Sequence, residues 1–218
     1  YLQTKLDKNP VTRFLAFSAL FEREMVRLLE DENASPSEAF AKEVMRTLKD
    51  EALMQSCGAM PLLMFESVSD PRFSHAYAKL YSAKQKILRN IAGLFKEELL
   101  GLYAKYAETL PKNGFCPAVL SAQFKRNAVR NLILTILAAL DSADVQELIS
   151  TQYYTAESAT VRLSALSLYL SSSAADRREL LAEELARSAS HPLAFENCIA
   201  AAANTARDTV SYLRMIEE

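Results

Sequence analysis

Two histidines are the first candidates for chemistry. His75 and His191 lie far apart, and neither belongs to a His-Glu-x-x-His helix or stands near a pair of cysteines, which are the spacings that commonly hold zinc. The sequence also contains no glycine-rich phosphate loop and no serine within a Gly-x-Ser-x-Gly turn. We therefore interpret both histidines as isolated surface or capping residues. The sequence predicts no catalytic residue and no metal ligand in this chain.

A pair of arginines is the next candidate. Arg126 and Arg130 are four residues apart, so they share one face of a helix, where like charges repel by a few tenths of a kcal/mol. Two interpretations remain open. Structurally, the guanidinium groups could hold carboxylates or helix-end carbonyls of adjoining helices, with Asn131 bonding to a loop, because buried charge normally has partners. Functionally, they could form an anion site, for instance for a substrate carboxylate.

Three further groups of residues are weaker candidates for a site. Tyr153-Tyr154 could stack on a ligand, although an aromatic pair at a helix end is more often packing. The segments Glu183-Glu184 and Asp176-Arg177-Arg178 predict a solvated face with surface ion pairs. On this interpretation Glu184 is exposed, and its replacement by alanine changes stability by at most about 0.5 kcal/mol.

The basic pair lies on a predicted central helix, Ser121–Leu140. The second half of this helix, from Leu132 onward, is apolar nearly all the way round, so it must be covered on every side. The first half carries the charges. We expect one end of the helix to meet polar groups or water and the other to form the core, with the following side chains almost fully buried: Leu132, Ile133, Ile136 and Leu137.

The composition is that of a globular protein with a helical bias. Of the 218 residues, 50% are hydrophobic, 24% are charged and only four are glycine. The net charge of −2 argues against sequence-independent nucleic-acid binding, which needs a basic face. Three widely spaced cysteines predict free thiols in a reducing compartment, and we find no membrane span and no signal peptide. We therefore expect a cytoplasmic protein with no nucleic-acid or membrane partner.

Capping residues and apolar spacing predict helices along the whole chain. Asn9-Pro10 predicts the start of the first long helix, Ser35-Pro36-Ser37-Glu38 resembles a capping box for the next, and Ser82 opens another. The helix after Ser82 contains Gly93 and Gly101, so we expect a kink or a close neighbour there. Shorter helices are expected over 143–150, 160–171, 175–189, 193–203 and 206–217.

Paired helices in series, with no strand-like alternation, predict an all-α fold. We expect a superhelical, armadillo-like solenoid of paired antiparallel helices. It would form a single domain over residues 1–218, with the loop 111–117 dividing it into two halves.

The order of several motifs resembles the C-terminal helical domain of bacterial-type aminopeptidase N, a family M1 zinc metallopeptidase. Arg126-Asn-Ala-Val-Arg130-Asn131-Leu-Ile-Leu resembles the Arg-x-x-Leu-Arg-Asn-x-x-Leu helix of that domain. The segments Glu97–Tyr103, Gln152–Ala156 and Thr160–Leu166 resemble its neighbouring motifs. The motif residues, which we interpret as structural, are Arg126, Arg130, Asn131, Thr160 and Leu166.

There are departures from the family pattern, and one short match is misleading. The family's Asn-Met-Thr-Asp is Ser158-Ala159-Thr160-Val161 here, and the chain has no tryptophan. Gly58-Ala59-Met60 matches the opening of the Gly-x-Met-Glu-Asn element that holds a substrate's amino terminus, but Pro61 follows in place of the carboxylate. We therefore regard the chain as a divergent member and assign no function to this match.

The resemblance implies a role rather than a site. The family's zinc ligands and catalytic glutamate lie in an upstream domain, so this chain would be a fragment of a larger enzyme, inactive by itself and without a cofactor. Zinc would belong to the parent enzyme, which removes amino-terminal residues from peptides by means of zinc-activated water. The partners would be the missing catalytic domain and the peptide substrates, and this domain would be a lid over the cavity. The alternative is a free-standing helical scaffold that binds a protein partner.

Overall fold

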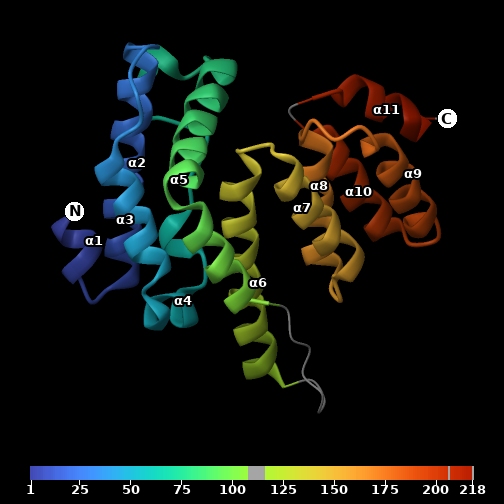
Figure 1. Ribbon diagram of the computed structural model, residues 1–218, viewed down its shortest axis with the longest axis horizontal. Helices are drawn as coiled ribbons and strands as arrows, with labels where there is room; N and C mark the ends of the chain where they lie inside the picture. The colour runs from blue at the N-terminus through green and yellow to red at the C-terminus, as the bar shows by residue number, and fades with distance from the viewer. Residues whose placement is uncertain (108–115, 206, 218) are drawn as a thin grey trace. The chain divides into compact units, whose positions relative to one another are not determined.

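The computed structural model describes residues 1–107, 116–205 and 207–217, and within these ranges the chain is all-helical. Figure 1 shows α-helices joined by short connections, with no strand in the described residues. The predicted fold class is therefore confirmed. The chain divides into two compact units, Tyr1–Ala139 and Leu140–Glu218. Most of the loop 111–117, where we expected a division into halves, lies outside the described residues.

The described residues of the first unit form six α-helices and two 3₁₀ turns. None of the helices in the described ranges combines the length and hydropathy that a membrane crossing needs. The elements are α1 (Leu2–Leu6), α2 (Pro10–Glu30), α3 (Glu38–Leu48), α4 (Glu51–Cys57), η1 (Met60–Leu62), η2 (Pro71–Phe73), α5 (Tyr77–Lys105) and α6 (Pro117–Ala138).

Side-chain caps fix where the early helices begin. Asn9 accepts a hydrogen bond from the backbone N–H of Val11 at the start of α2, as its position before Pro10 predicted. The cap of α3 is Ser37, not Ser35, and its hydroxyl accepts from Phe40. The position of this cap is set by a distant residue, because Glu24 on α2 accepts the backbone N–H of Ser37.

The long helix α5 begins five residues before the predicted start. Ser82 lies inside α5 and does not cap it. The reason is tertiary: Leu80 is buried, so extending the helix toward its amino terminus covers apolar surface that a start at Ser82 would leave exposed. The expected kink is present at Phe95, whose φ of −130° and ψ of 27° are not helical, two residues after Gly93.

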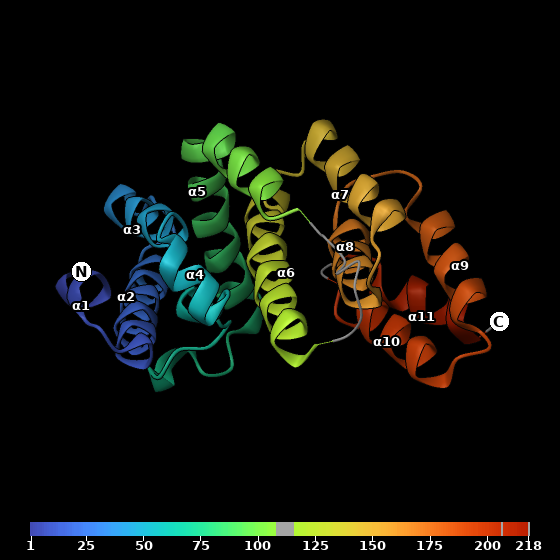
Figure 2. The ribbon, with the colours of Figure 1, turned by 90° about the horizontal axis from the view of Figure 1, so that it is seen from below.

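Helix α6 carries the core of the first unit, as expected, with one exception. Ile133, Ile136 and Leu137 are completely buried, and α6 packs against α4 and α5, with α5 beside it in both Figure 1 and Figure 2. Leu132 is only half-buried, so this part of the prediction is wrong. The helix also begins at Pro117, before the predicted Ser121.

The second unit contains five helices of similar length. They are α7 (Ala143–Thr155), α8 (Ala159–Ser171), α9 (Arg177–Ser188), α10 (Pro192–Ala203) and α11 (Thr209–Glu217). Helix α8 packs against α7, α9 and α10, and α11 packs against α9 and α10. Helix α7 runs past the predicted end at residue 150 because Gln152 and Tyr153 are buried within the unit.

Candidate functional site

Arg126 closes the carboxyl-terminal end of α5. Its Nε donates to the carbonyl of Ala107 at 2.9 Å, and its Nη2 donates to the carbonyl of Lys105. The guanidinium carbon lies 5.6 Å from the centre of the Tyr106 ring. A cation at this position satisfies carbonyls that have no partner inside the helix and interacts favourably with the helix dipole. In this structure the guanidinium therefore joins α6 to α5.

Arg130 lies one turn further along α6 and contacts a single aromatic residue. Its Nη2 donates to the Tyr103 hydroxyl at 2.9 Å, and its guanidinium carbon lies 4.5 Å from the centre of that ring. Burial raises the pKa of Tyr103, and the charge and hydrogen bond of Arg130 only partly oppose this. The buried Nε of Arg130 has no hydrogen-bond partner among the described residues. A cation over a desolvated ring is attracted to the ring face, so Arg130 also connects α6 to α5.

The remaining motif residues lie on both units of the chain. The backbone carbonyl of Asn131 accepts from Thr135 within α6 at 2.8 Å. Thr160 is exposed in the first turn of α8, and Leu166 is completely buried in the same helix. Because α8 belongs to the second unit, the five residues are divided between two units and form no common constellation within either.

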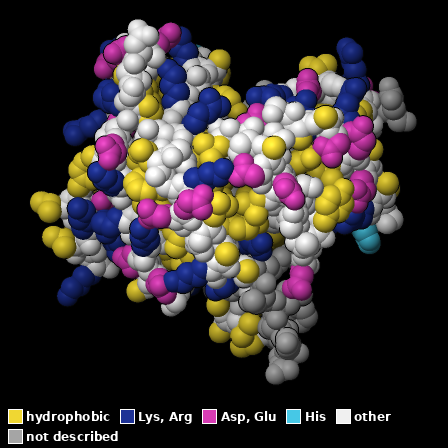
Figure 3. All heavy atoms as spheres, viewed as in Figure 1, with side chains coloured by type: hydrophobic (Ala, Val, Ile, Leu, Met, Phe, Trp, Pro, Cys, Tyr) yellow, Lys and Arg dark blue, Asp and Glu magenta, His cyan; other side chains and the backbone are white. Residues whose placement is uncertain are grey.

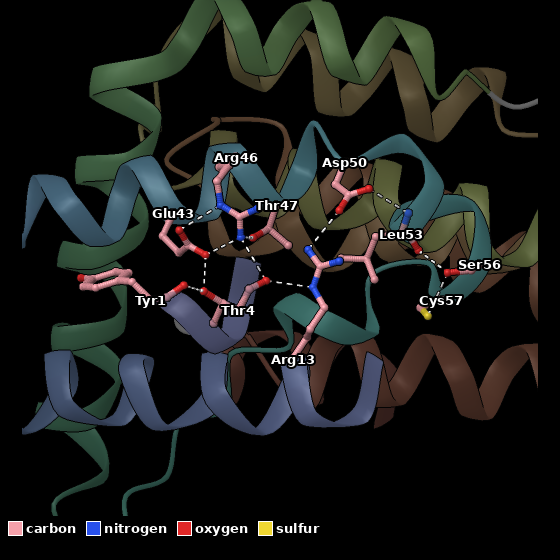
Figure 4. Close-up of polar contacts among 10 residues, drawn as sticks. All are labelled: Tyr1, Thr4, Arg13, Glu43, Arg46, Thr47, Asp50, Leu53, Ser56 and Cys57. Atoms are coloured by element: carbon pink, nitrogen blue, oxygen red, sulfur yellow. Dashed lines mark hydrogen bonds and ion pairs between the residues drawn. The ribbon is translucent and has the colours of Figure 1, made fainter. Parts of the chain in front are cut away.

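A buried glutamate on α3 holds α1 in place (Figure 4). The Glu43 carboxylate accepts from the Thr4 hydroxyl and from Nε of Arg46, the latter at 3.0 Å. The Thr4 carbonyl accepts from Arg13 at 2.8 Å and from Arg46 at 3.1 Å. Burial raises the pKa of Glu43, but the hydrogen bonds from Arg46 and Thr4 and the nearby positive charges outweigh it, so the net pKa lies below the ordinary value.

A second buried glutamate corrects the expected solvated face on α9. Glu184 has a relative exposure of 1%, contrary to the sequence-based prediction. Its carboxylate accepts from the Tyr153 hydroxyl at 2.9 Å and from Nε of Arg162 at 3.2 Å. Burial raises the pKa of Tyr153, and the hydrogen bond to Glu184 raises it further. Glu184 therefore ties α9 to α7 and α8, while its neighbour Glu183 stays exposed.

All buried glutamates of the described residues share one pattern. Glu24, Glu43 and Glu184 each have an arginine three residues later on the same helix, and each also accepts a hydrogen bond from a different helix or its cap. Helical spacing could have identified Glu184, since Leu180 and Ser188, four residues before and after it, are also buried. The partners could not have been identified in this way, because they lie far away in the sequence.

The other candidates contribute packing. The Tyr153 and Tyr154 rings meet edge-on with centroids 5.0 Å apart, and Tyr153 is buried. His75 and His191 are exposed, and across the described part of the chain no three His, Cys, Asp or Glu side chains come together to hold a metal ion. The polar groups described above are used to join helices, and in the described residues they form no catalytic arrangement.

Comparison with known families identifies a matching helical-repeat family. A family model described as a domain of unknown function (DUF3458_C) with ARM repeats matches residues 1–217. The chain belongs to this family. The predicted relation to the C-terminal helical domain of M1 aminopeptidases is therefore confirmed at the level of the family, and the armadillo-type repeat matches the predicted pairing of helices.

A solved structure has the same fold as this ARM-repeat domain. The crystal structure of Legionella pneumophila aminopeptidase A in complex with aspartic acid superimposes with a TM-score of 0.83 at 16% sequence identity. The match covers 100% of this chain and 26% of the aminopeptidase chain, so the ARM-repeat domain spans about a quarter of that protein. A search of curated proteins with this sequence finds no significant match.

Proposed function

We propose that this ARM-repeat domain is the C-terminal part of a longer zinc aminopeptidase, in which it forms a lid over the catalytic cavity. The observation that carries the proposal is the family match over residues 1–217. The similarity of the whole chain to a quarter of an aminopeptidase supports it. In the proposed enzyme, peptides lose amino-terminal residues one at a time, and the lid limits entry to small peptides.

The zinc of the proposed enzyme does not fit the residues described here. No cluster of three or more His, Cys, Asp and Glu side chains occurs in the described ranges, so the metal ligands belong to the catalytic domain of the longer chain. That domain is the proposed partner, and its substrates are peptides. The free thiols of Cys57, Cys116 and Cys198 suit a reducing compartment, for which we propose the cytoplasm.

The first experiment concerns the longer reading frame. We expect it to encode a Gly-x-Met-Glu-Asn element and a His-Glu-x-x-His helix upstream, and the purified product to cleave an aminoacyl-anilide in a chelator-sensitive reaction. The 218-residue chain purified alone should not cleave it. A reading frame without these motifs and without activity would favour the alternative of a free-standing scaffold.

The second experiment tests gating. In the longer enzyme, single cysteines at exposed positions on each helix of the ARM-repeat domain are coupled to a bulky maleimide. The kcat/KM is then measured for a long peptide and for a dipeptide-sized substrate. A lid should act on which substrates reach the metal and not on bond cleavage, so labels on one face should reduce only the long-peptide value. If both values fall in parallel at every position, or neither changes at any, the domain is a structural brace and not a lid.

A further inference from the structure

Helix α2 has a second apolar face besides the one that enters the core. Its core face is formed by Phe17, Phe21, Met25 and Leu28, all buried. With about 100° between successive residues, another set gathers on a neighbouring sector roughly a third of a turn away. We call this set the α2 face: it consists of Val11, Leu15, Ser18, Ala19, Glu22 and Val26.

The α2 face is partly open to solvent, with three of its six residues exposed and the other three half-buried. Val11 is 55% exposed and Leu15 is 59% exposed. An exposed helical sector normally carries charged or polar residues, but four of the six residues on the α2 face are apolar. Helix α1, which packs against α2, adds the exposed side chains of Leu2 and Leu6, and hydrophobic side chains are visible over α1 at the left edge of Figure 3.

A groove beside the α2 face extends the apolar surface. It lies between α2 and the segment 63–69, and its walls include Ser18, Leu63 and Phe65. Leu63 and Phe65 are exposed, and Glu22 holds the segment by accepting the backbone N–H of Ser69. The hydroxyl of Ser18 is buried and has no hydrogen-bond partner among the described residues. The apolar character of the groove therefore comes from Leu63 and Phe65, which stand open on the wall opposite α2.

The position of α2 in the repeat makes the open face unusual. In repeat proteins each layer buries its apolar surface against the next, and a terminal layer that faces water has a polar outer side. Helix α1 packs against α2, yet the α2 face beside it is mainly apolar. A layer with an apolar outer side is expected where other protein covers it.

We propose that the α2 face and the groove beside it form the surface on which the preceding part of the parent enzyme packs. This rests on the proposed function. In the proposed C-terminal domain the preceding polypeptide joins ahead of α1, which packs against α2, and the domain spans only 26% of the aminopeptidase that it resembles. The occupant is an apolar surface of that preceding part.

Thiol labelling tests the proposal without relying on enzyme activity. In both the 218-residue chain and the longer enzyme, Cys57 and Cys116 are replaced by serine, and buried Cys198 is left in place. Single cysteines are then introduced as Val11→Cys or Leu15→Cys, with Lys42→Cys as the matched control. The control lies on α3 in a side chain that is 64% exposed, away from the α2 face.

We expect the cysteines at positions 11 and 15 to react with a maleimide as fast as the control in the 218-residue chain. In the longer enzyme they should react about tenfold or more slowly, because labelling then requires local opening of the interface, while the control keeps its rate. Equal rates at all three positions in the longer enzyme would overturn the proposal. Slow labelling of the 218-residue chain that depends on its concentration would also overturn it, in favour of a second copy as occupant. If protection occurs in a longer protein that lacks peptidase activity, only the proposed function fails.

Discussion

Replacing Glu184 tests how the second unit is held together. Its carboxylate is 1% exposed and accepts from Tyr153 on α7, from Arg162 on α8 and, at 3.6 Å, pairs with Arg187 on its own helix. Glu184→Ala removes the acceptor and leaves the Tyr153 hydroxyl and the Arg162 guanidinium in a mostly dehydrated site. Removing one member of a buried ion pair typically costs about 3–5 kcal/mol, so we expect a loss of unfolding free energy in that range.

The adjacent residue supplies a matched control. Glu183 also bonds to a tyrosine and to Arg187, but its side chain is 43% exposed, and exposed pairs contribute about 0–1 kcal/mol. Glu183→Ala should therefore cost at most about 1 kcal/mol. A third variant, Glu184→Leu combined with Arg162→Met, replaces both charges by apolar side chains and should cost less than Glu184→Ala alone.

Urea unfolding measures these differences. Far-ultraviolet circular dichroism follows the helices, and the fluorescence of the nine tyrosines follows tertiary packing, since the chain has no tryptophan. Two probes are needed because the two units could unfold separately, in which case a single free energy would not describe the transition. The reasoning is refuted if Glu183→Ala and Glu184→Ala lower the midpoint equally, or if Glu184→Ala changes the unfolding free energy by less than about 0.5 kcal/mol.

Three other outcomes follow from the described contacts. Leu137→Ala, at a completely buried position, should cost about 2–5 kcal/mol by urea unfolding, and an effect no larger than that of Leu132→Ala would contradict the burial. Gly101→Ala should raise the Tm, since an added Cβ meets no atom within 4 Å and alanine favours helix by about 1 kcal/mol. Gly58→Ala should lower the Tm, because the φ of Gly58 is 61° and the Lys125 backbone is 3.1 Å from the added Cβ. The folded-state pKa of Glu43 is depressed, so its contribution to the free energy of unfolding is present above the unfolded pKa and is lost as the pH falls through the folded pKa. Glu43→Gln should therefore make the urea midpoint less sensitive to acid. Identical pH profiles for the variant and the original chain would disprove this.

Local sequence determined the helical class and most of the helix positions. Asn9 and Asp50 cap the helices that follow them, because a short polar side chain can accept an N–H from the first turn without help from the rest of the protein. Apolar spacing also identified α6 as a core helix. The family was recognisable because its motifs retain their order along the chain, even though the similar aminopeptidase structure shares only 16% of its residues.

Tertiary structure alone decided what the buried charged residues bind on other helices. Glu184 and Glu183 are adjacent and chemically identical, but only Glu184 is buried. Its partners lie 31 and 22 residues away, and the partner of Glu43 lies 39 residues away. A carboxylate tolerates burial only where donors converge on it, and that convergence depends on how α7, α8 and α9, or α1 and α3, pack together. The spacing of residues within a single helix indicates the arginine three residues after each glutamate, but not the donors on other helices.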